Sequence, residues 1–214
     1  MKRGSLWSVG LAAVVVSVVL LAGCAQRTGG TAPSPTAVTP GNSTTGAQDE
    51  WAVCAYDGMV MKKQGMGATA QYQGKTLYFC NDDHQDRFMA DPEKYQRTWQ
   101  ALGDDVSFNI LPVAEHMQAI SDMGLHMEEP SGTTHHVTVC VMAGAQASPV
   151  TDLAVSAQLT SPQGKAIALD MPLASDGKHY AANVKLPATG EYQVEVALSR
   201  AGDRETHSFT YAVR

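Results

Sequence analysis

The C-terminal half of the chain alternates between apolar and polar positions. From His135 onward, apolar residues recur at every second position, as in Val137, Val139 and Val141. Turn signals rich in Gly, Pro, Ser and Asp separate these runs at 161–164, 175–177, 188–190 and 201–203. A period of two predicts half-buried strands, and about six or seven short strands at this spacing predict an antiparallel β-sandwich over residues 135–214.

The preceding residues carry shorter and mixed patterns. Residues 51–102 predict a small α/β unit with a strand at 76–79, a helix capped by Asn81 and running to about Met89, and a second helix from Asp91-Pro92 to about Leu102. Residues 103–134 predict a connector with a helix near 113–122. The expected fold class is α+β, with an immunoglobulin-like sandwich as its second domain.

The N-terminus predicts export and lipidation. An apolar run from Leu6 to Leu21 follows a short basic start, and it is marginal in length for a membrane-spanning helix. It ends in Leu21-Ala22-Gly23-Cys24, which resembles the lipobox of bacterial lipoproteins. This resemblance implies a signal peptide at 1–23 and a lipid on Cys24; an uncleaved anchor helix or a plain secretory signal are the alternatives. Residues 24–50 are rich in Gly, Ser, Thr and Pro and are expected to form a flexible tether.

A lipid on Cys24 makes a membrane of the cell envelope the first expected partner. Ala25 follows the cysteine, which favours the periplasmic side of the outer membrane if the cell is Gram-negative. Loss of Lys2 and Arg3 from the 15 Lys and Arg residues leaves 13 against 21 Asp and Glu. An acidic chain without basic clusters is a poor binder of nucleic acid, so no nucleic-acid partner is expected.

The cysteine count leaves an odd thiol. With Cys24 lipidated, Cys54, Cys80 and Cys140 remain. Exported proteins usually pair their cysteines, but three cannot all pair within one chain. At least one thiol is therefore free, bound to a metal, or bonded to a partner. Cys140 is expected to be a core thiol of the sandwich.

Cys80 and His84 have the spacing of metal ligands. Cys80 falls at the end of the strand predicted at 76–79, and His84 lies four residues later in the first turn of a helix. Because helical side chains lean toward the N-terminus, His84 is aimed back at the turn that carries Cys80. Cys54 is expected to arrive from the preceding loop. Thiolate and imidazole together suit Zn²⁺ or Cu⁺.

Residues 51–98 resemble the YHS domain, a relative of the TRASH metal-binding motif. The likeness rests on Cys54 with Gly58-Met59, on 74–80 (Gly-Lys-Thr-Leu-Tyr-Phe-Cys), on His84 and Phe88, and on 91–95 (Asp-Pro-Glu-Lys-Tyr). It implies a treble-clef-like metal-binding fold with Cys54, Cys80 and His84 as ligands. Two departures are the histidine where the family usually has a third cysteine, and the residues inserted between Cys54 and Gly58. A Cys54–Cys80 disulfide with His84 on the surface is the alternative, which we consider weaker because it leaves the position of His84 unexplained.

The connector and the first sandwich strand are rich in histidine and methionine. Thioether and imidazole are ligands that exported copper proteins use, because thioethers favour Cu⁺. The weaker candidate ligands are therefore Met59, Met123, His126, Met127, His135 and His136. His116, Ile120, Met123 and Met127 also fall near helical spacing, so a packed stripe is the preferred interpretation of that group.

The sandwich also resembles a known group. His-His-Val at 135–137, Ser-Pro-Gln-Gly-Lys at 161–165 and His179-Tyr180 are similar to features of YtkA-like or copper-resistance-type β-sandwiches of bacterial envelopes. The resemblance is loose and implies a transition metal without fixing its ligands. His179 and His207 are expected at strand edges on the surface.

Together these features predict an envelope lipoprotein that binds a transition metal, with Cu⁺ preferred and Zn²⁺ as the alternative. Its role would be sequestration, resistance, or delivery to an efflux or assembly protein. The competing hypothesis is an adaptor lipoprotein without metal, stapled by a Cys54–Cys80 disulfide. No enzyme is expected, since the sequence contains no Gly-x-Ser-x-Gly, no His-Glu-x-x-His and no Gly-rich phosphate loop.

Overall fold

The computed structural model describes residues 50–144 and 147–214, which fall in one compact unit. The predicted signal peptide, the lipid on Cys24 and nearly all of the tether at 24–50 lie outside the described residues. Among the residues that are described, no helix is long and apolar enough to cross a membrane. This part of the chain is mostly β, with antiparallel sheets and few helices.

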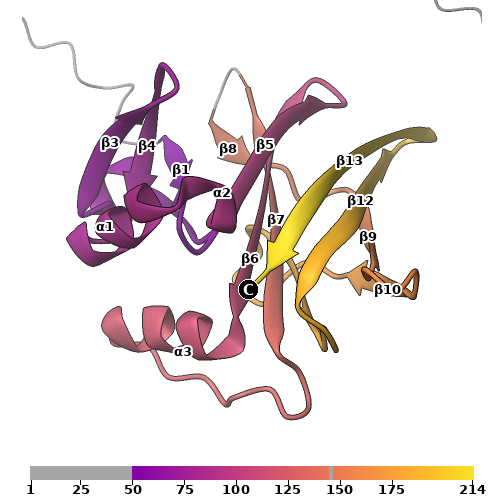
Figure 1. Ribbon diagram of the computed structural model, residues 1–214. Coiled ribbons are helices and arrows are strands. Elements are labelled where there is room, and N and C mark those ends of the chain that lie inside the picture. Colours follow the sequence, from indigo (N-terminus) through magenta and orange to yellow (C-terminus); the bar gives the residue numbers. More distant parts are fainter. Residues whose placement is uncertain (1–49, 145–146) are drawn as a thin grey trace, which may run out of the picture. The chain divides into compact units, whose positions relative to one another are not determined.

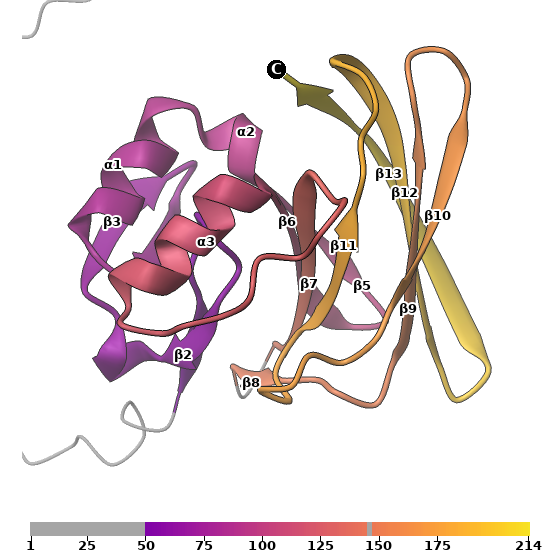
Figure 2. The same ribbon diagram turned by 90° about the horizontal axis from the view of Figure 1, so that it is seen from below.

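Two antiparallel sheets form a sandwich, which Figures 1 and 2 show from two directions. The first sheet has the order β10-β9-β12-β13, with β9 at Ala154–Thr160, β10 at Ala166–Met171, β12 at Gly190–Arg200 and β13 at Asp203–Val213. The second has the order β11-β7-β6-β5, with β5 at Gln96–Ala101, β6 at Asp104–Pro112, β7 at His135–Ala143 and β11 at Tyr180–Val184. The short β8 (Ser148–Pro149) pairs with β7. The predicted antiparallel sandwich is therefore confirmed.

The core of the sandwich explains the alternation in the sequence. Val137, Val139 and Val141 of β7 are buried, as are Val194 and Val196 of the facing sheet. Successive side chains of a strand point to opposite faces, so an apolar residue at every second position supplies one continuous inner layer.

The sandwich begins earlier in the chain than predicted. The helix expected to reach Leu102 is wrong beyond Tyr95, because α2 covers only Pro92–Tyr95 and β5 follows it directly. On β5, Trp99 stacks on His207 at 4.5 Å between ring centroids and also packs against Phe209. Burial of this large aromatic outweighs the weak helix preference of its neighbours. Strands from the ranges 51–102 and 103–134 thus belong to the second sheet.

A small module precedes the sandwich. It contains a hairpin of β1 (Trp51–Val53) and β2 (Val60–Lys62), a 3-10 turn at Lys63–Gly65, a hairpin of β3 (Ala68–Tyr72) and β4 (Lys75–Phe79), and helix α1 (Asp82–Ala90). The strand predicted at 76–79 and the helix after Asn81 are confirmed. Tyr56, Phe79, Phe88 and Tyr95 form the centre of its apolar core.

The module rests on the outer face of the second sheet, and helix α3 (Val113–Asp122) lies beside it (Figure 2). Buried Asn109 of β6 donates a hydrogen bond to the carbonyl oxygen of Ala55 at 2.8 Å. The buried thiol of Cys140 on β7 donates to the carbonyl oxygen of Gly58 at 3.0 Å. Both bonds satisfy buried backbone acceptors of the loop between β1 and β2, so the sheet fixes the position of that loop.

Candidate metal centre

A tight turn after β1 positions Cys54. The N–H of Cys54 donates to the carbonyl oxygen of Met59 at 2.8 Å, and the N–H of Gly58 donates to the carbonyl oxygen of Cys54 at 2.9 Å. Gly58 has a φ of +76°, a conformation that favours glycine. Beside the turn, the N–H of Ala55 bonds to the carbonyl oxygen of Tyr78 at 3.0 Å. Cys54 is thereby held against the end of β4, where Cys80 follows.

The junction between β4 and α1 positions Cys80 and His84. The side chain of Asn81 caps α1 by accepting the N–H of His84 at 2.8 Å, which fixes the first helical turn. The ring of His84 lies 4.7 Å from that of Tyr56 and is 1 % exposed. Gly67 faces the junction so closely that a Cβ there would lie 2.5 Å from the carbonyl oxygen of Cys80. The sequence around the junction therefore leaves little freedom to either ligand candidate.

Four donor side chains converge between the turn and the helix. Atoms of Cys54, Asp57, Cys80 and His84 all lie within 4.8 Å of one another. The Sγ of Cys54 is 3.7 Å from Nδ1 of His84, and Oδ2 of Asp57 is 3.4 Å from the same nitrogen. The Sγ of Cys80 is 3.8 Å from Oδ2 of Asp57. The three side chains predicted from the sequence are thus brought together, and Asp57 joins them.

These separations match the edges of a tetrahedral metal site. Bonds of about 2.0–2.3 Å to N, O and S place neighbouring ligand atoms about 3.3–3.8 Å apart. The three measured separations, 3.4, 3.7 and 3.8 Å, fall within that range. Two sulfurs, one imidazole and one carboxylate form a donor set suited to Zn²⁺, and the sulfurs also suit Cu⁺.

The electrostatics of the cluster are uneven between the two thiols. Burial, together with Cys80 and Asp57, raises the pKa of Cys54 well above its usual value. The hydrogen bond from Cys54 and the neighbouring His84 lower the pKa of Cys80. Burial alone would lower the pKa of His84, but Cys80 and Asp57 outweigh it and raise that pKa. Cys80 is therefore the thiol that ionises first, and a cation would be needed to hold the second thiolate in this buried place.

The geometry bears on the disulfide alternative as well. Cys54, Cys80 and Cys140 are free thiols in the described structure. The alternative placed His84 on the surface, whereas the side chain is buried and its Nε2 has no hydrogen-bond partner. A buried, unpartnered ring nitrogen is costly. The position of His84 thus fits a ligand better than a surface residue.

A second group of donors lines a cavity of about 230 Å³ between α3 and the outer face of β7. The rings of His116 and His136 stack there at 3.8 Å between centroids, and neither ring nitrogen of buried His116 has a hydrogen-bond partner. Nδ1 of His136 lies 2.8 Å from Oδ1 of Asn183, and Nδ1 of His179 lies 3.2 Å from Oδ2 of Asp176. Each of those two rings therefore presents Nε2 to a ligand.

The cavity is not a formed metal site in this conformation. The lone pairs of two parallel stacked rings do not converge on one point, so a shared ion would require one ring to turn. Burial, with added repulsion from His136 and His179, lowers the pKa of His116 to about 3. Burial also lowers the pKa of His136 and of His179. The three imidazoles are consequently neutral near pH 7, which is the form that binds metals.

The weaker sequence candidates are divided by the structure. Met59, Met127 and His136 line the imidazole cavity. His135 points to the other face of β7, where its Nδ1 lies 2.9 Å from the hydroxyl of Thr134, and exposed His126 does not line the cavity. Met123 caps the end of α3 and is also absent from the cavity wall. The packed stripe is borne out for His116 and Ile120, which are buried on α3, but not for Met127, which is half exposed.

Sequence reasoning missed several donors. Asp57 belongs to the residues inserted between Cys54 and Gly58, and a carboxylate three residues after a cysteine is itself a candidate ligand. The expectation that His179 lies on the surface is wrong, since it is half-buried in the cavity wall. The stacking of His116 on His136 depends on how α3 folds back over β7, and no local signal indicates it.

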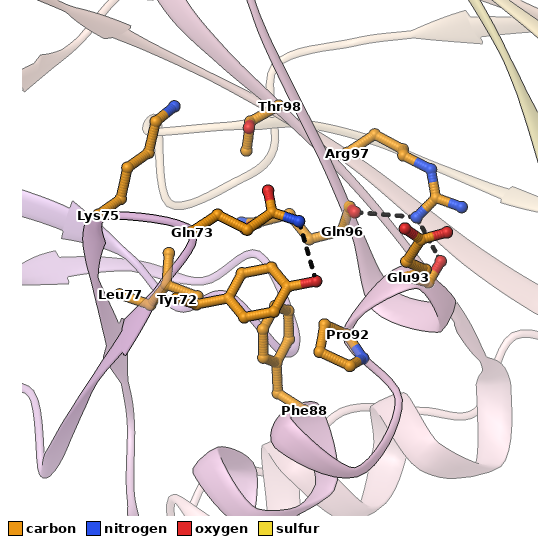
Figure 3. Close-up of a pocket in the computed structure, with 10 residues that line it drawn as sticks. All are labelled: Tyr72, Gln73, Lys75, Leu77, Phe88, Pro92, Glu93, Gln96, Arg97 and Thr98. Atoms are coloured by element: carbon orange, nitrogen blue, oxygen red, sulfur yellow. Dashed lines mark hydrogen bonds between the residues drawn. The ribbon is translucent and has the colours of Figure 1, made fainter. Parts of the chain in front are cut away.

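A further cavity of about 220 Å³, shown in Figure 3, lies among β3, β4, α1 and the chain from α2 into β5. Tyr72, Phe88 and Pro92 form its apolar side, and the Nε2 of Gln73 donates to the hydroxyl of Tyr72 at 3.2 Å. Its wall contains no cysteine, histidine or methionine. It therefore offers no soft donor and is separate from the metal chemistry.

Residues 106–211 match a family model described as Fe2+ transport protein. The match covers just under half of the chain and coincides with most of the sandwich. The sandwich is thus similar to Fe2+ transport proteins, and its resemblance to YtkA-like or copper-resistance-type sandwiches stays a prediction. No curated protein matches the chain at a significant level.

Several solved structures resemble the sandwich distantly. A DUF4426 family protein from Pseudomonas aeruginosa PAO1 has 16 % identity and a TM-score of 0.43, over 55 % of this chain and 94 % of that one. FetP of uropathogenic Escherichia coli strain F11, expressed in the periplasm of E. coli, has 16 % identity and a TM-score of 0.40, over 56 % and 93 %. A copper-bound variant of Campylobacter jejuni P19 has 13 % identity and a TM-score of 0.40, over 56 % and 95 %. Because the identities and TM-scores are this low, we assign no ligand of these proteins to this chain.

Proposed function

We propose that this protein is an envelope lipoprotein that binds a transition metal, with Cu⁺ preferred and Zn²⁺ as the alternative. Its ligands would be Cys54, Cys80 and His84, joined by Asp57. The observation that supports this most strongly is the convergence of the four donor atoms within 4.8 Å, with three of their separations equal to the edge lengths of a tetrahedral site. The family match of the sandwich, to Fe2+ transport proteins, supports a role in metal handling.

The resemblance of residues 51–98 to the YHS domain agrees with this proposal, and so does its implied treble-clef-like fold. The imidazole cavity would be a weaker second site, reached when His116 or His136 rotates out of the stack. Its thioethers, on Met59 and Met127, favour Cu⁺. Two unlike sites on one chain suit sequestration or delivery better than catalysis, and we expect no enzymatic activity.

Localisation completes the proposal. The Leu-Ala-Gly-Cys sequence at 21–24 supports a lipid on Cys24 and attachment to a membrane of the envelope, the outer membrane in a Gram-negative cell. A metal efflux or assembly protein would receive the ion. Mass spectrometry of the protein from its membrane fraction should show a chain that begins at lipidated Cys24, and a chain that retains residues 1–23 would contradict the proposal.

Elemental analysis tests the metal centre. The purified, reduced protein should retain about one Cu⁺ or Zn²⁺ per chain at the thiolate site after desalting. Cys80→Ala should lose that equivalent. Cys140→Ser is the matched control, because it replaces a cysteine outside the donor cluster and keeps a hydroxyl that can donate to the carbonyl oxygen of Gly58. Uptake of neither metal by the reduced wild-type protein would refute the proposal.

An adaptor stapled by Cys54–Cys80 remains the second hypothesis, because the two sulfurs lie in one cluster and could be joined by oxidation. Counting reactive thiols separates the two. Thiols that a chelator releases belong to a metal site, whereas thiols released only by a reductant belong to a disulfide.

A further inference from the structure

Met61 adds a third sulfur to the donor cluster. This residue lies on β2, where it pairs with Ala52 of β1, and its backbone position is fixed by that pairing. Its Sδ lies 3.8 Å from the Sγ of Cys80. The same Sγ lies 3.8 Å from Oδ2 of Asp57, so Cys80 has a soft neighbour and a hard neighbour at equal distance.

We propose that the centre holds two classes of cation with different donor sets, and that Met61 is the ligand that selects Cu⁺. Zn²⁺ would use Cys54, Asp57, Cys80 and His84. Cu⁺ would use the two cysteine sulfurs with the thioether of Met61. This inference rests on the proposed function, because it assigns a cation class to donors within and beside that site.

Ligand chemistry supports the division. A thioether is a soft, neutral donor that favours Cu⁺, whereas a carboxylate favours harder cations. Zn²⁺ commonly takes four ligands in a tetrahedron, and the four inner donors already provide them. Met61 therefore adds nothing that Zn²⁺ needs but supplies a third soft donor for Cu⁺.

Charge balance leads to the same division. Zn²⁺ with two thiolates and one carboxylate has a net charge of minus one, and Cu⁺ with two thiolates and a neutral thioether has the same net charge. In the copper form, the carboxylate of Asp57 would not ligate and would keep Nδ1 of His84, 3.4 Å from its Oδ2, as its partner. The thioether completes the copper ligands without bringing a further charge into a cluster where Cys54, Asp57 and His84 are all buried.

Two substitutions test the division in opposite directions. Met61→Leu keeps nearly the same volume but removes the sulfur, and Asp57→Asn keeps the shape but removes the charge. Both are made in a background with His116→Leu and His136→Leu, so that the imidazole cavity does not compete for the ion. Cu⁺ and Zn²⁺ are titrated into the reduced protein, each against a chromophoric chelator of that ion.

Met61→Leu should weaken Cu⁺ binding about tenfold or more and leave Zn²⁺ binding within about twofold. Asp57→Asn should do the reverse. Met66→Leu is the matched control from the same segment and should change neither affinity. The division is overturned if Met61→Leu weakens both cations equally or neither. Failure of the proposed function gives a different result, namely that the parent protein binds neither cation.

A measurement on the unsubstituted centre keeps the test independent of variant folding. X-ray absorption of the protein carrying one equivalent of Cu⁺ should give three sulfur neighbours for copper. The zinc-loaded protein should give two sulfurs together with nitrogen and oxygen. Only two sulfur neighbours around copper would overturn the role of Met61.

Discussion

His116 should make the stability of the metal-free protein depend on pH. Burial on α3 lowers its pKa from 6.5 to about 3, because the charged ring would be desolvated beside His136 and His179. Between these values the unfolded chain binds a proton at this site and the folded protein does not. Stability contributed by the neutral ring is therefore present above about pH 6.5 and is lost as the pH falls toward 3.

The size of the effect follows from the same two pKa values. At about pH 5, protonation of the unfolded state alone stabilises it by about 2 kcal/mol, whereas at about pH 7.5 the effect is about 0.1 kcal/mol. Replacing the ring by leucine removes the titrating group from both states. The wild-type protein should consequently lose about 2 kcal/mol more than His116→Leu over this interval.

Urea unfolding of the reduced, chelator-treated protein at the two pH values measures this difference. His84, His135, His136 and His179 are present in both proteins, so most of the difference between the two losses comes from His116. His126→Leu is the matched control, since it removes an exposed histidine that lies outside the cavity. Equal losses in the wild type and in His116→Leu would refute the burial of a neutral His116.

Two further predictions concern the residues that shape the metal centre. Gly58 and Gly74 both have a φ of +76°, but a Cβ on Gly58 would lie 3.0 Å from Cγ2 of Thr138, while nothing lies within 4 Å of one on Gly74. Gly74→Ala should therefore lower the unfolding free energy by about 1–2 kcal/mol, because of the positive φ alone. Gly58→Ala should lower it by about 1–3 kcal/mol more, because the added Cβ also crowds Thr138. Equal midpoints of the two variants in thermal unfolding would contradict the packing of the turn on β7. Asn81→Ala should lower the unfolding free energy by about 1 kcal/mol, because the helix cap is lost. It should also weaken metal binding about tenfold, because the first turn of α1 no longer holds His84 in place. An unchanged affinity in a chelator competition would show that the cap does not position His84.

The sequence predicted the features that local patterns encode. The alternation at Val137, Val139 and Val141 predicts a strand whose alternate side chains face the core, and Asn81 before a polar run predicts the N-terminal cap of a helix. The pairing of Cys80 with His84 also follows from local geometry, since four residues span one turn. Each of these features is determined by residues that are close in the chain.

Features that depend on distant residues could not be predicted in the same way. The sequence of Gln96–Ala101 has no strong strand signal. The segment forms β5 because Trp99 packs against His207 and Phe209 of the other sheet, which lie more than 100 residues later in the chain. The register in which β5 pairs with β6 is likewise determined by tertiary packing. Asp91-Pro92 correctly predicted where α2 begins, but nothing in the local sequence indicates that the helix ends at Tyr95.

The donor cluster combines both situations. Its two sequence-local ligands, Cys80 and His84, could be named from their spacing, but Asp57 and Met61 reach them only because the loop after β1 folds back. That fold depends on Asn109 and Cys140, which belong to the sandwich and satisfy the carbonyl oxygens of Ala55 and Gly58. The sandwich is therefore part of the metal centre in a physical sense: without its two hydrogen-bond donors, the buried turn would lose partners for two carbonyl groups. Cation selectivity in the small module should accordingly respond to substitutions in β6 and β7 that touch no ligand.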